Sequence, residues 1–170
     1  MRRILMAIAL VAFSPAVARA EGAWDVAKKA AGGSTTAKLE KEVNKRLLDE
    51  GRKNQCSFKS GTAELEPGCD AKATKLARQL IDAKKKLAGA GVKNFKFVVS
   101  GHTDSTGDEA KNVELSRVRA AVMVKQLVAK GVAEAEIESV GMGSSKPLVK
   151  PDDTPAKKAK NRRYEVQVKL

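Results

Sequence analysis

Aromatic side chains and histidine are scarce in this chain of 170 residues, which has one Trp, one Tyr, four Phe and one His. A buried core must therefore consist mainly of Leu, Val, Ile and Ala. With one histidine and two cysteines, the chain offers too few ligands for an ordinary zinc site. Long apolar runs are scarce too. After the N-terminal segment, no stretch approaches the roughly twenty apolar residues that a membrane-spanning helix needs.

The first twenty residues have the pattern of a secretory signal peptide. Arg2 and Arg3 precede the apolar run "ILMAIALVAF", and "SPAVARA" follows with Ala18 and Ala20 in an A-x-A arrangement. A basic start, a short apolar run and small residues at a cleavage site are the three parts of such a signal. The alternative is a buried core helix. We expect cleavage after Ala20, export to the periplasm and no transmembrane segment in the mature protein.

Charge of one sign dominates, with 33 Lys and Arg against 20 Asp and Glu, a formal net charge of +13. In a cytoplasmic protein this balance favours nucleic acid as a partner. An exported protein meets other polyanions, namely carboxylate-rich wall polymer and anionic lipid. We therefore expect no nucleic-acid partner.

The two cysteines, Cys56 and Cys69, bracket the segment "SFKSGTAELEPG". Export permits a disulfide, and two cysteines allow a single intramolecular pairing. Closing so short a loop stabilises a fold by about 3 kcal/mol in the chain-entropy model. Free buried thiols are the alternative. We expect a structural disulfide that is dispensable for ligand binding.

The chain is predicted to have three parts: a signal peptide (1–20), a linker with an N-terminal helix (21–53), and a domain (54–170). The linker ends in "AAGGS", a composition typical of flexible segments. A helix is predicted over 35–52, where Leu39, Val43 and Leu47 recur at helical spacing. Its narrow apolar stripe either packs on the domain or recruits a partner.

The domain is predicted to be a compact α/β unit with the order β-α-β-α-β-β. Its elements form a mixed sheet with both helices on one face. The expected strands are 56–60, 95–101, 136–143 and 163–170, and the expected helices are 70–87 and 110–130. A loop rich in Pro, Asp and Lys joins the last two strands.

Three segments of this domain carry recognisable motifs: "VVSGHTDSTGDEAKNVELSRVRA", "GMGSSKPLVKPDDT" and "AKNRRYEV". With G-H-T-D, N-x-x-L-S-x-x-R-A and N-R-R in this order and spacing, the chain closely resembles the OmpA-like domain that anchors outer membranes to peptidoglycan. The resemblance runs from about Phe58 to Leu170. It departs from the common pattern at Lys59, where many members carry an acid or asparagine.

The resemblance implies binding of diaminopimelate, the residue of the wall's stem peptide that has a free ammonium and a free carboxylate on one carbon. Such a zwitterion needs an acid and a base that face each other. By the match these are Asp104, just past the end of a strand, and Arg119, on the following helix. Arginine can hold a carboxylate through two parallel hydrogen bonds, which lysine cannot do.

The same match implies further site residues. Asn112, Leu115 and Thr106 line the pocket, and Thr103 and Arg162 stand behind it. Each assignment has a plainer alternative: Asp104 and Arg119 form a salt bridge with each other, Asn112 caps a helix, and Leu115 belongs to the core.

These residues indicate a non-enzymatic protein that binds peptidoglycan and needs no cofactor or metal. It is expected in the periplasm of a Gram-negative-type bacterium, with association to the outer membrane and to other envelope proteins left open. One alternative is an envelope interaction protein whose main partner docks on the N-terminal helix. The other is an exported hydrolase, but no nucleophile can be nominated. His102 is expected to be structural.

Overall fold

The computed structural model of the protein describes residues 15–59 and 61–170, and the chain divides into two units, 1–37 and 38–170. The basic start and the whole apolar run of the predicted signal peptide lie outside the described residues. Helix α1 (Pro15–Lys53) begins well before Thr35 and continues through the stretch that the sequence predicts to be a linker. In residues 21–33, alanine and lysine, which favour helix, outnumber the three glycines.

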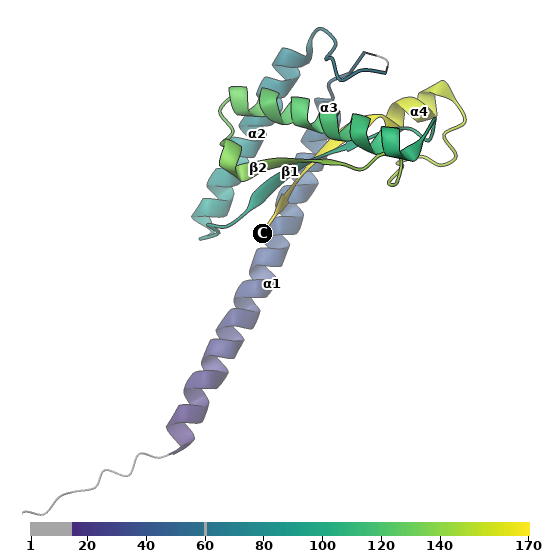
Figure 1. The fold of residues 1–170 in the computed structure, drawn as a ribbon. Coiled ribbons are helices and arrows are strands. Elements are labelled where there is room, and N and C mark those ends of the chain that lie inside the picture. Colours follow the sequence, from purple (N-terminus) through teal and green to yellow (C-terminus); the bar gives the residue numbers. More distant parts are fainter. Residues whose placement is uncertain (1–14, 60) are drawn as a thin grey trace, which may run out of the picture. The chain divides into compact units, whose positions relative to one another are not determined.

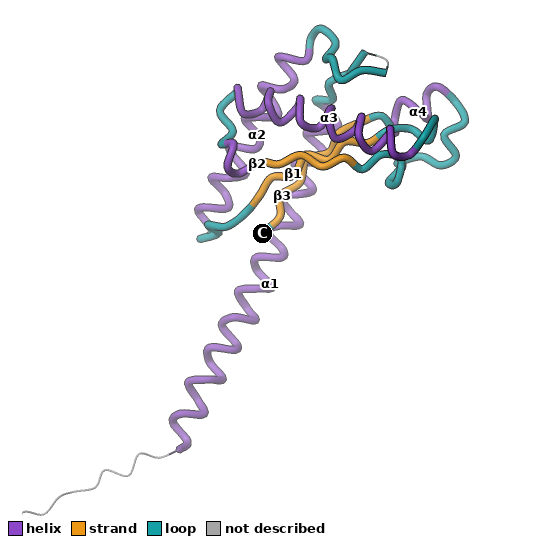
Figure 2. The backbone as a smooth tube through the Cα atoms, in the orientation of Figure 1, coloured by secondary structure: helices purple, strands orange, loops and turns teal. Residues whose placement is uncertain are grey.

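The second unit contains a three-stranded mixed sheet in the order β2–β1–β3 (Figure 2). The central strand β1 (Lys96–His102) pairs in parallel with β2 (Ile137–Gly141) and antiparallel with β3 (Arg163–Lys169). Helix α2 (Cys69–Gly89) precedes β1, and α3 (Glu109–Ala129) connects β1 to β2 through the short turn η1 (Glu134–Glu136). Helix α4 (Pro155–Asn161) connects β2 to β3. Figure 1 shows α3 lying across β1 and β2. The predicted mixed α/β fold is confirmed.

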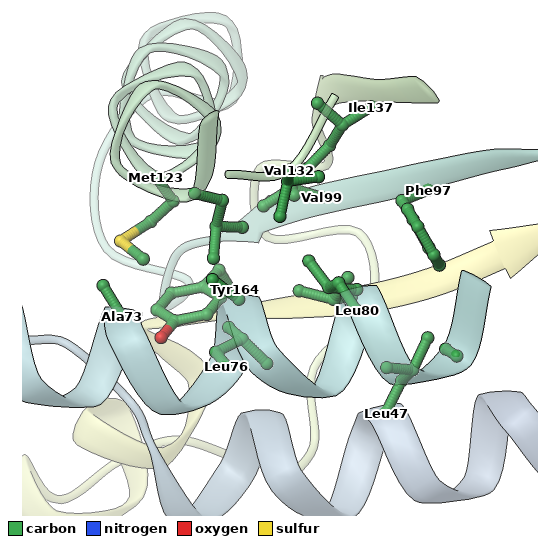
Figure 3. Packing of buried hydrophobic residues seen from close by; sticks show 14 of the residues in the cluster. Leu47, Ala73, Leu76, Leu80, Phe97, Val99, Met123, Val132, Ile137 and Tyr164 are labelled. Atoms are coloured by element: carbon green, nitrogen blue, oxygen red, sulfur yellow. The ribbon is translucent and has the colours of Figure 1, made fainter. Parts of the chain in front are cut away.

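The core lies on one face of the sheet. Alternate residues of the strands, such as Phe97 and Val99, join leucines of α2 and the stripe of α3 in a single buried cluster (Figure 3). Burying each large aliphatic side chain contributes about 1.5–3 kcal/mol. Val43 and Leu47 of α1 belong to the same cluster and are almost fully buried. The apolar stripe of α1 therefore packs on the domain, which leaves that stripe unavailable to a partner.

The predicted strand 56–60 is wrong, because only an isolated bridge between Phe58 and Leu65 forms there. Two side-chain amides of the α1 region already bond the outer edge of β3. Asn44 both donates to and accepts from the backbone of Val168, and Gln55 does the same with Tyr164. These are backbone groups that a fourth strand would need, so the sheet ends at β3.

The helix α4 stands in the stretch that the sequence predicts to be a loop. It begins where Thr154 accepts a hydrogen bond from the backbone N–H of Lys157, with Pro155 in the first turn. A threonine cap followed by proline is a common helix start, and it is the signal by which this helix could have been found. None of the helices in the described part of the chain is long and apolar enough to cross a membrane.

Candidate ligand-binding groove

The glycines and the serine of the motifs bring α3 close to the sheet. A Cβ on Gly101 would overlap the Ser116 carbonyl oxygen, and one on Gly141, its partner across β1 and β2, would overlap that of Val113. Ser116 is fully buried, and its hydroxyl accepts a hydrogen bond from the backbone N–H of Gly143. This close packing fixes the position of α3, and so of the residues that α3 presents beyond the end of β1.

Asp104 lies two residues past β1, with its carboxylate held on both oxygens. Arg162 donates to Oδ2 at 2.8 Å, and the backbone N–H of Thr106 donates to Oδ1 at 3.0 Å. Burial acts to raise the pKa of Asp104, but these hydrogen bonds and the charge of Arg162 outweigh it, so the pKa lies below its usual value. Asp104 is therefore an anion at neutral pH, and a carboxylate has lone pairs left for a further donor.

Arg119 is a buried cation that makes no ion pair with any acid among the described residues. Its Nε donates to the carbonyl oxygen of Thr62 at 2.8 Å, and one terminal nitrogen donates to that of Lys59 at 3.4 Å. The guanidinium carbon lies 5.1 Å from the centre of the Phe58 ring. Burial and the neighbouring charge of Arg162 lower the pKa of Arg119, which nonetheless stays positive at neutral pH.

The plainer alternative, a salt bridge between Asp104 and Arg119, is thus absent, because Asp104 pairs with Arg162 instead. Two other plain alternatives fail as well. The helix α3 is capped by Asp108, while the Asn112 side chain donates to the Thr106 carbonyl oxygen at 3.0 Å. Leu115 is half-buried and lies outside the core cluster.

All seven residues predicted for the site line one groove of about 1000 Å³, together with Phe58 and residues of α4. They are Thr103, Asp104, Thr106, Asn112, Leu115, Arg119 and Arg162. The structure therefore brings the whole predicted set together. Its Asp104 and Arg119 offer opposite charges, both largely buried, and they form no ion pair with each other.

The predicted disulfide joins Cys56 and Cys69, with 5.1 Å between their Cα atoms. The loop that it closes contains Phe58, Lys59 and Thr62, which are the three residues that hold Arg119. Lys59 contributes its carbonyl oxygen, so the departure from the common family residue at this side chain does not remove the contact. The disulfide loop is one wall of the groove.

The role of Asp152 was not foreseen from the sequence. Asp152 accepts hydrogen bonds from the backbone N–H and the hydroxyl of Ser105, and from the buried amide of Asn161. These bonds lower the pKa of Asp152 to about 2. Asn161 also bonds the backbone of Val149. The asparagine of N-R-R thus acts through Asp152 on the loop that carries Asp104. Only the presence of "DD" within the segment "GMGSSKPLVKPDDT" hinted at this.

His102 and Ser100 approach each other without forming a catalytic triad. His102 Nε2 lies 3.3 Å from the Ser100 hydroxyl and 4.0 Å from Glu165, while the buried Nδ1 has no hydrogen-bond partner in the described structure. A triad needs a carboxylate on Nδ1 to orient the ring while Nε2 takes the proton of the nucleophile. Burial and the charge of Arg163 lower the pKa of His102 to about 4 despite Glu165, so the ring is neutral at pH 7. This residue is a structural part of the sheet.

Comparison with known proteins decides the family. Residues 57–162 match the OmpA family. The chain belongs to the OmpA family. This assignment is in line with a binding domain rather than an enzyme. Among the described residues of this OmpA-family chain, no group of three or more His, Cys, Asp or Glu could hold a metal ion.

Two relatives illustrate the extent of the likeness. This OmpA-family chain is 44% identical over 73 residues to the peptidoglycan-binding protein ArfA of Mycobacterium tuberculosis. The aligned residues cover 43% of this chain and 22% of ArfA. The chain is 46% identical over 70 residues to outer membrane porin F of Pseudomonas fluorescens, which covers 41% of this chain and 21% of the porin. The match spans about a fifth of the length of these curated relatives.

Solved structures share the fold of this OmpA-family domain. The peptidoglycan-associated lipoprotein from Burkholderia pseudomallei is similar with a TM-score of 0.56 and 23% identity, over 68% of this chain and 89% of that one. The C-terminal domain of Helicobacter pylori MotB is similar with a TM-score of 0.55 and 25% identity, over 68% and 84% of the two chains.

Proposed function

We propose that this protein binds peptidoglycan non-covalently, through the diaminopimelate of the stem peptide, in the envelope of a Gram-negative-type bacterium. Asp104 accepts from the ligand's ammonium, and Arg119 donates to the carboxylate on the same carbon. Asn112 and Thr106 add polar contacts, and Leu115 packs against the ligand's methylene chain. Thr103 and Arg162 support Asp104.

The observation that carries the proposal is that Arg119 forms no ion pair with an acid in the described part of the chain. Its guanidinium is largely buried, and its hydrogen bonds go to backbone carbonyl oxygens, which leave donors free. A buried cation without a counter-ion is costly, so an anion that enters the groove gains a strong partner. Asp104, which lines the same groove, favours a ligand with an ammonium beside that anion.

The named relatives support the same polymer. ArfA is named a peptidoglycan-binding protein, and the structurally similar lipoprotein is named for its association with peptidoglycan. The predicted signal peptide, if cleaved after Ala20, would deliver the domain to the periplasm, where the polymer lies. Association with the outer membrane, or with proteins in it, would then tie the wall to that membrane.

The test is a titration of residues 21–170 with soluble muropeptides that contain either diaminopimelate or lysine. We expect binding of the diaminopimelate form alone, since lysine lacks the second carboxylate. Leaving one charge of a bound ligand unpaired costs about 2–5 kcal/mol. Asp104→Ala, Arg119→Ala and Arg119→Lys should therefore each weaken binding more than tenfold.

The matched control is Arg117→Lys, because Arg117 lies on the same helix but is exposed and paired with Glu114. It should bind like the wild type. Circular dichroism of each variant confirms that the fold survives. Equal binding of both muropeptides by all variants would mean that only general positive charge attracts the wall, and the proposal would fail.

A further inference from the structure

The groove carries more positive charge than a single zwitterionic carbon requires. Six basic side chains line it against two acidic ones, Glu66 and Asp104. Arg162 is paired with Asp104, and Arg163 with Glu165. The remaining cations besides Arg119 form no ion pair with an acid in the part of the chain that the structure describes. They are Arg52, Lys158 and Lys160.

These three cations come from two elements at the rim. Arg52 stands in the last turn of α1, and Lys158 and Lys160 stand on α4. The ends of α4 are fixed by the Thr154 cap and by Asn161, which is fully buried. The three charges therefore lie on helices that form a fixed wall of the groove, and not on a free loop. A ligand that extends beyond Asp104 and Arg119 would meet them.

We propose that Arg52, Lys158 and Lys160 make the groove selective for stem peptides whose other carboxylates are free rather than amidated. This rests on the proposed function, since it concerns the same ligand. The stem peptide L-alanyl-γ-D-glutamyl-diaminopimelate has more carboxylates than ammonium groups at neutral pH. Amidation replaces a carboxylate oxygen by an NH₂ of similar size, so it removes charge while it leaves shape almost unchanged.

The position of the three cations favours a peptide over a membrane surface. They line the same groove as Asp104 and Arg119, so a peptide held by that pair lies within reach of them. Arg52 and Lys160 are exposed and Lys158 is half-buried, so water and salt screen these charges and limit the strength of each interaction. The expected preference is therefore moderate, about threefold to tenfold for the three charges together.

The experiment compares two disaccharide-tripeptides that differ only at the α-carboxyl of D-glutamate, free or amidated. We expect the wild type to bind the free form about threefold to tenfold more tightly at low salt, with a smaller difference at physiological salt. In Lys158→Gln/Lys160→Gln, affinity for the free form should fall toward that of the amidated form. Affinity for the amidated form should change little.

The control variant is Lys93→Gln/Lys169→Gln, which removes the same charge at the opposite end of β1. Lys93 precedes that strand and Lys169 pairs with its first residue, and both are exposed. This variant should keep the wild-type preference. If it loses the preference to the same extent as the α4 variant, net charge rather than the rim is responsible, and the inference is overturned.

Other outcomes separate the inference from the proposed function. Binding of neither peptide would sink the proposed function and this inference with it. Equal binding of both peptides, with dependence on Asp104 and Arg119 intact, would overturn the inference alone. An effect of the α4 substitutions on vesicles of phosphatidylglycerol, with none on the muropeptides, would assign the rim to a membrane and overturn it too.

Discussion

The motifs reveal only part of what the individual side chains of the groove do, because they do not show which residues contact each other. Asp104 and Arg119 look like a complementary pair in the sequence, yet each is held by a different partner. Arg162 holds the acid, and carbonyl oxygens of the disulfide loop hold the base. This arrangement keeps both charges separate and oriented before any ligand arrives. Such preorganisation lowers the entropy that binding would otherwise cost.

Asp152 is expected to stabilise the fold in a pH-dependent way. Its pKa in the folded protein is about 2, below the roughly 3.9 of an unfolded aspartate. The stability that it contributes is therefore fully present above about pH 4 and is lost as the pH falls through about 2. Asp152→Asn should lower the urea midpoint at pH 6, and its difference from the wild type should shrink at pH 2.5.

The neighbouring Asp153→Asn is the control for this measurement, since Asp153 is exposed and paired only with Lys157. It should shift the midpoint little at either pH. A difference between wild type and Asp152→Asn that stays constant from pH 6 to pH 2.5 would contradict the assigned role. The same variant should also weaken muropeptide binding, because Ser105 directly follows Asp104.

Among the elements, the disulfide loop has the most consequence for the site. Sequence reasoning treats the Cys56–Cys69 bond as dispensable for binding. The structure places the three contacts of Arg119 within the loop that this bond closes. Opening it frees the loop, so we expect Cys56→Ser/Cys69→Ser to lower the melting temperature and to weaken muropeptide binding roughly threefold or more.

Reduction of the wild type should reproduce both effects, and the reductant should leave the double variant unchanged. Binding at a temperature well below both melting transitions separates the effect on Arg119 from general unfolding. Wild-type affinity in the folded double variant would show that Arg119 is held without the disulfide.

The elements that the sequence predicts well are those with strong local signals. The helices α2 and α3 have regular apolar spacing and clear ends. The strand β1 contains a short apolar run, and β3 alternates polar with apolar residues. The strand at 56–60 fails because its pairing site on β3 is taken by Asn44 and Gln55, which are 124 and 109 residues away from their partners. No local pattern reports a contact of that range.

In the site, too, the sequence predicts some features and misses those that depend on distant contacts. The motifs predict its seven lining residues, because the family pattern fixes their order and spacing. What they do not report is which of these residues touch one another. The pairing of Asp104 with Arg162, and the link from Asn161 through Asp152 to Ser105, depend on how α4 folds back against the loop after β1.

At the scale of the whole molecule, the compact unit begins earlier than the predicted domain. It starts at Lys38 and so includes the part of α1 that carries Val43, Asn44 and Leu47. A fragment of residues 38–170 should therefore fold and bind muropeptides like the longer chain. A fragment of residues 54–170 loses two buried aliphatic side chains worth about 3–6 kcal/mol together, and it uncovers the edge of β3.

Urea unfolding of the two fragments tests this boundary. The shorter fragment should have a much lower midpoint, or should aggregate through the exposed edge strand. Equal midpoints would mean that α1 contributes nothing to the domain. Val43→Ala/Leu47→Ala in the 38–170 fragment provides the matched variant, since it removes the burial and keeps Asn44.

Export is the last expectation, and it concerns the chain as a whole. The proposed binding of a wall peptide is useful only where the wall lies. The basic start, short apolar run and A-x-A pattern of residues 1–20 match the signal that would take the chain there. Expressed in full in a Gram-negative host, the protein should be released with the periplasmic fraction, and its mass should correspond to a chain that starts at Glu21.

The periplasm also permits the Cys56–Cys69 bond, so the released protein should contain no alkylatable thiol before reduction. Replacing Ala18 and Ala20 with bulky residues should block processing and leave the longer chain in the inner membrane. Uncleaved wild-type protein in the cytoplasm, with two free thiols, would show that the first twenty residues are not a signal peptide.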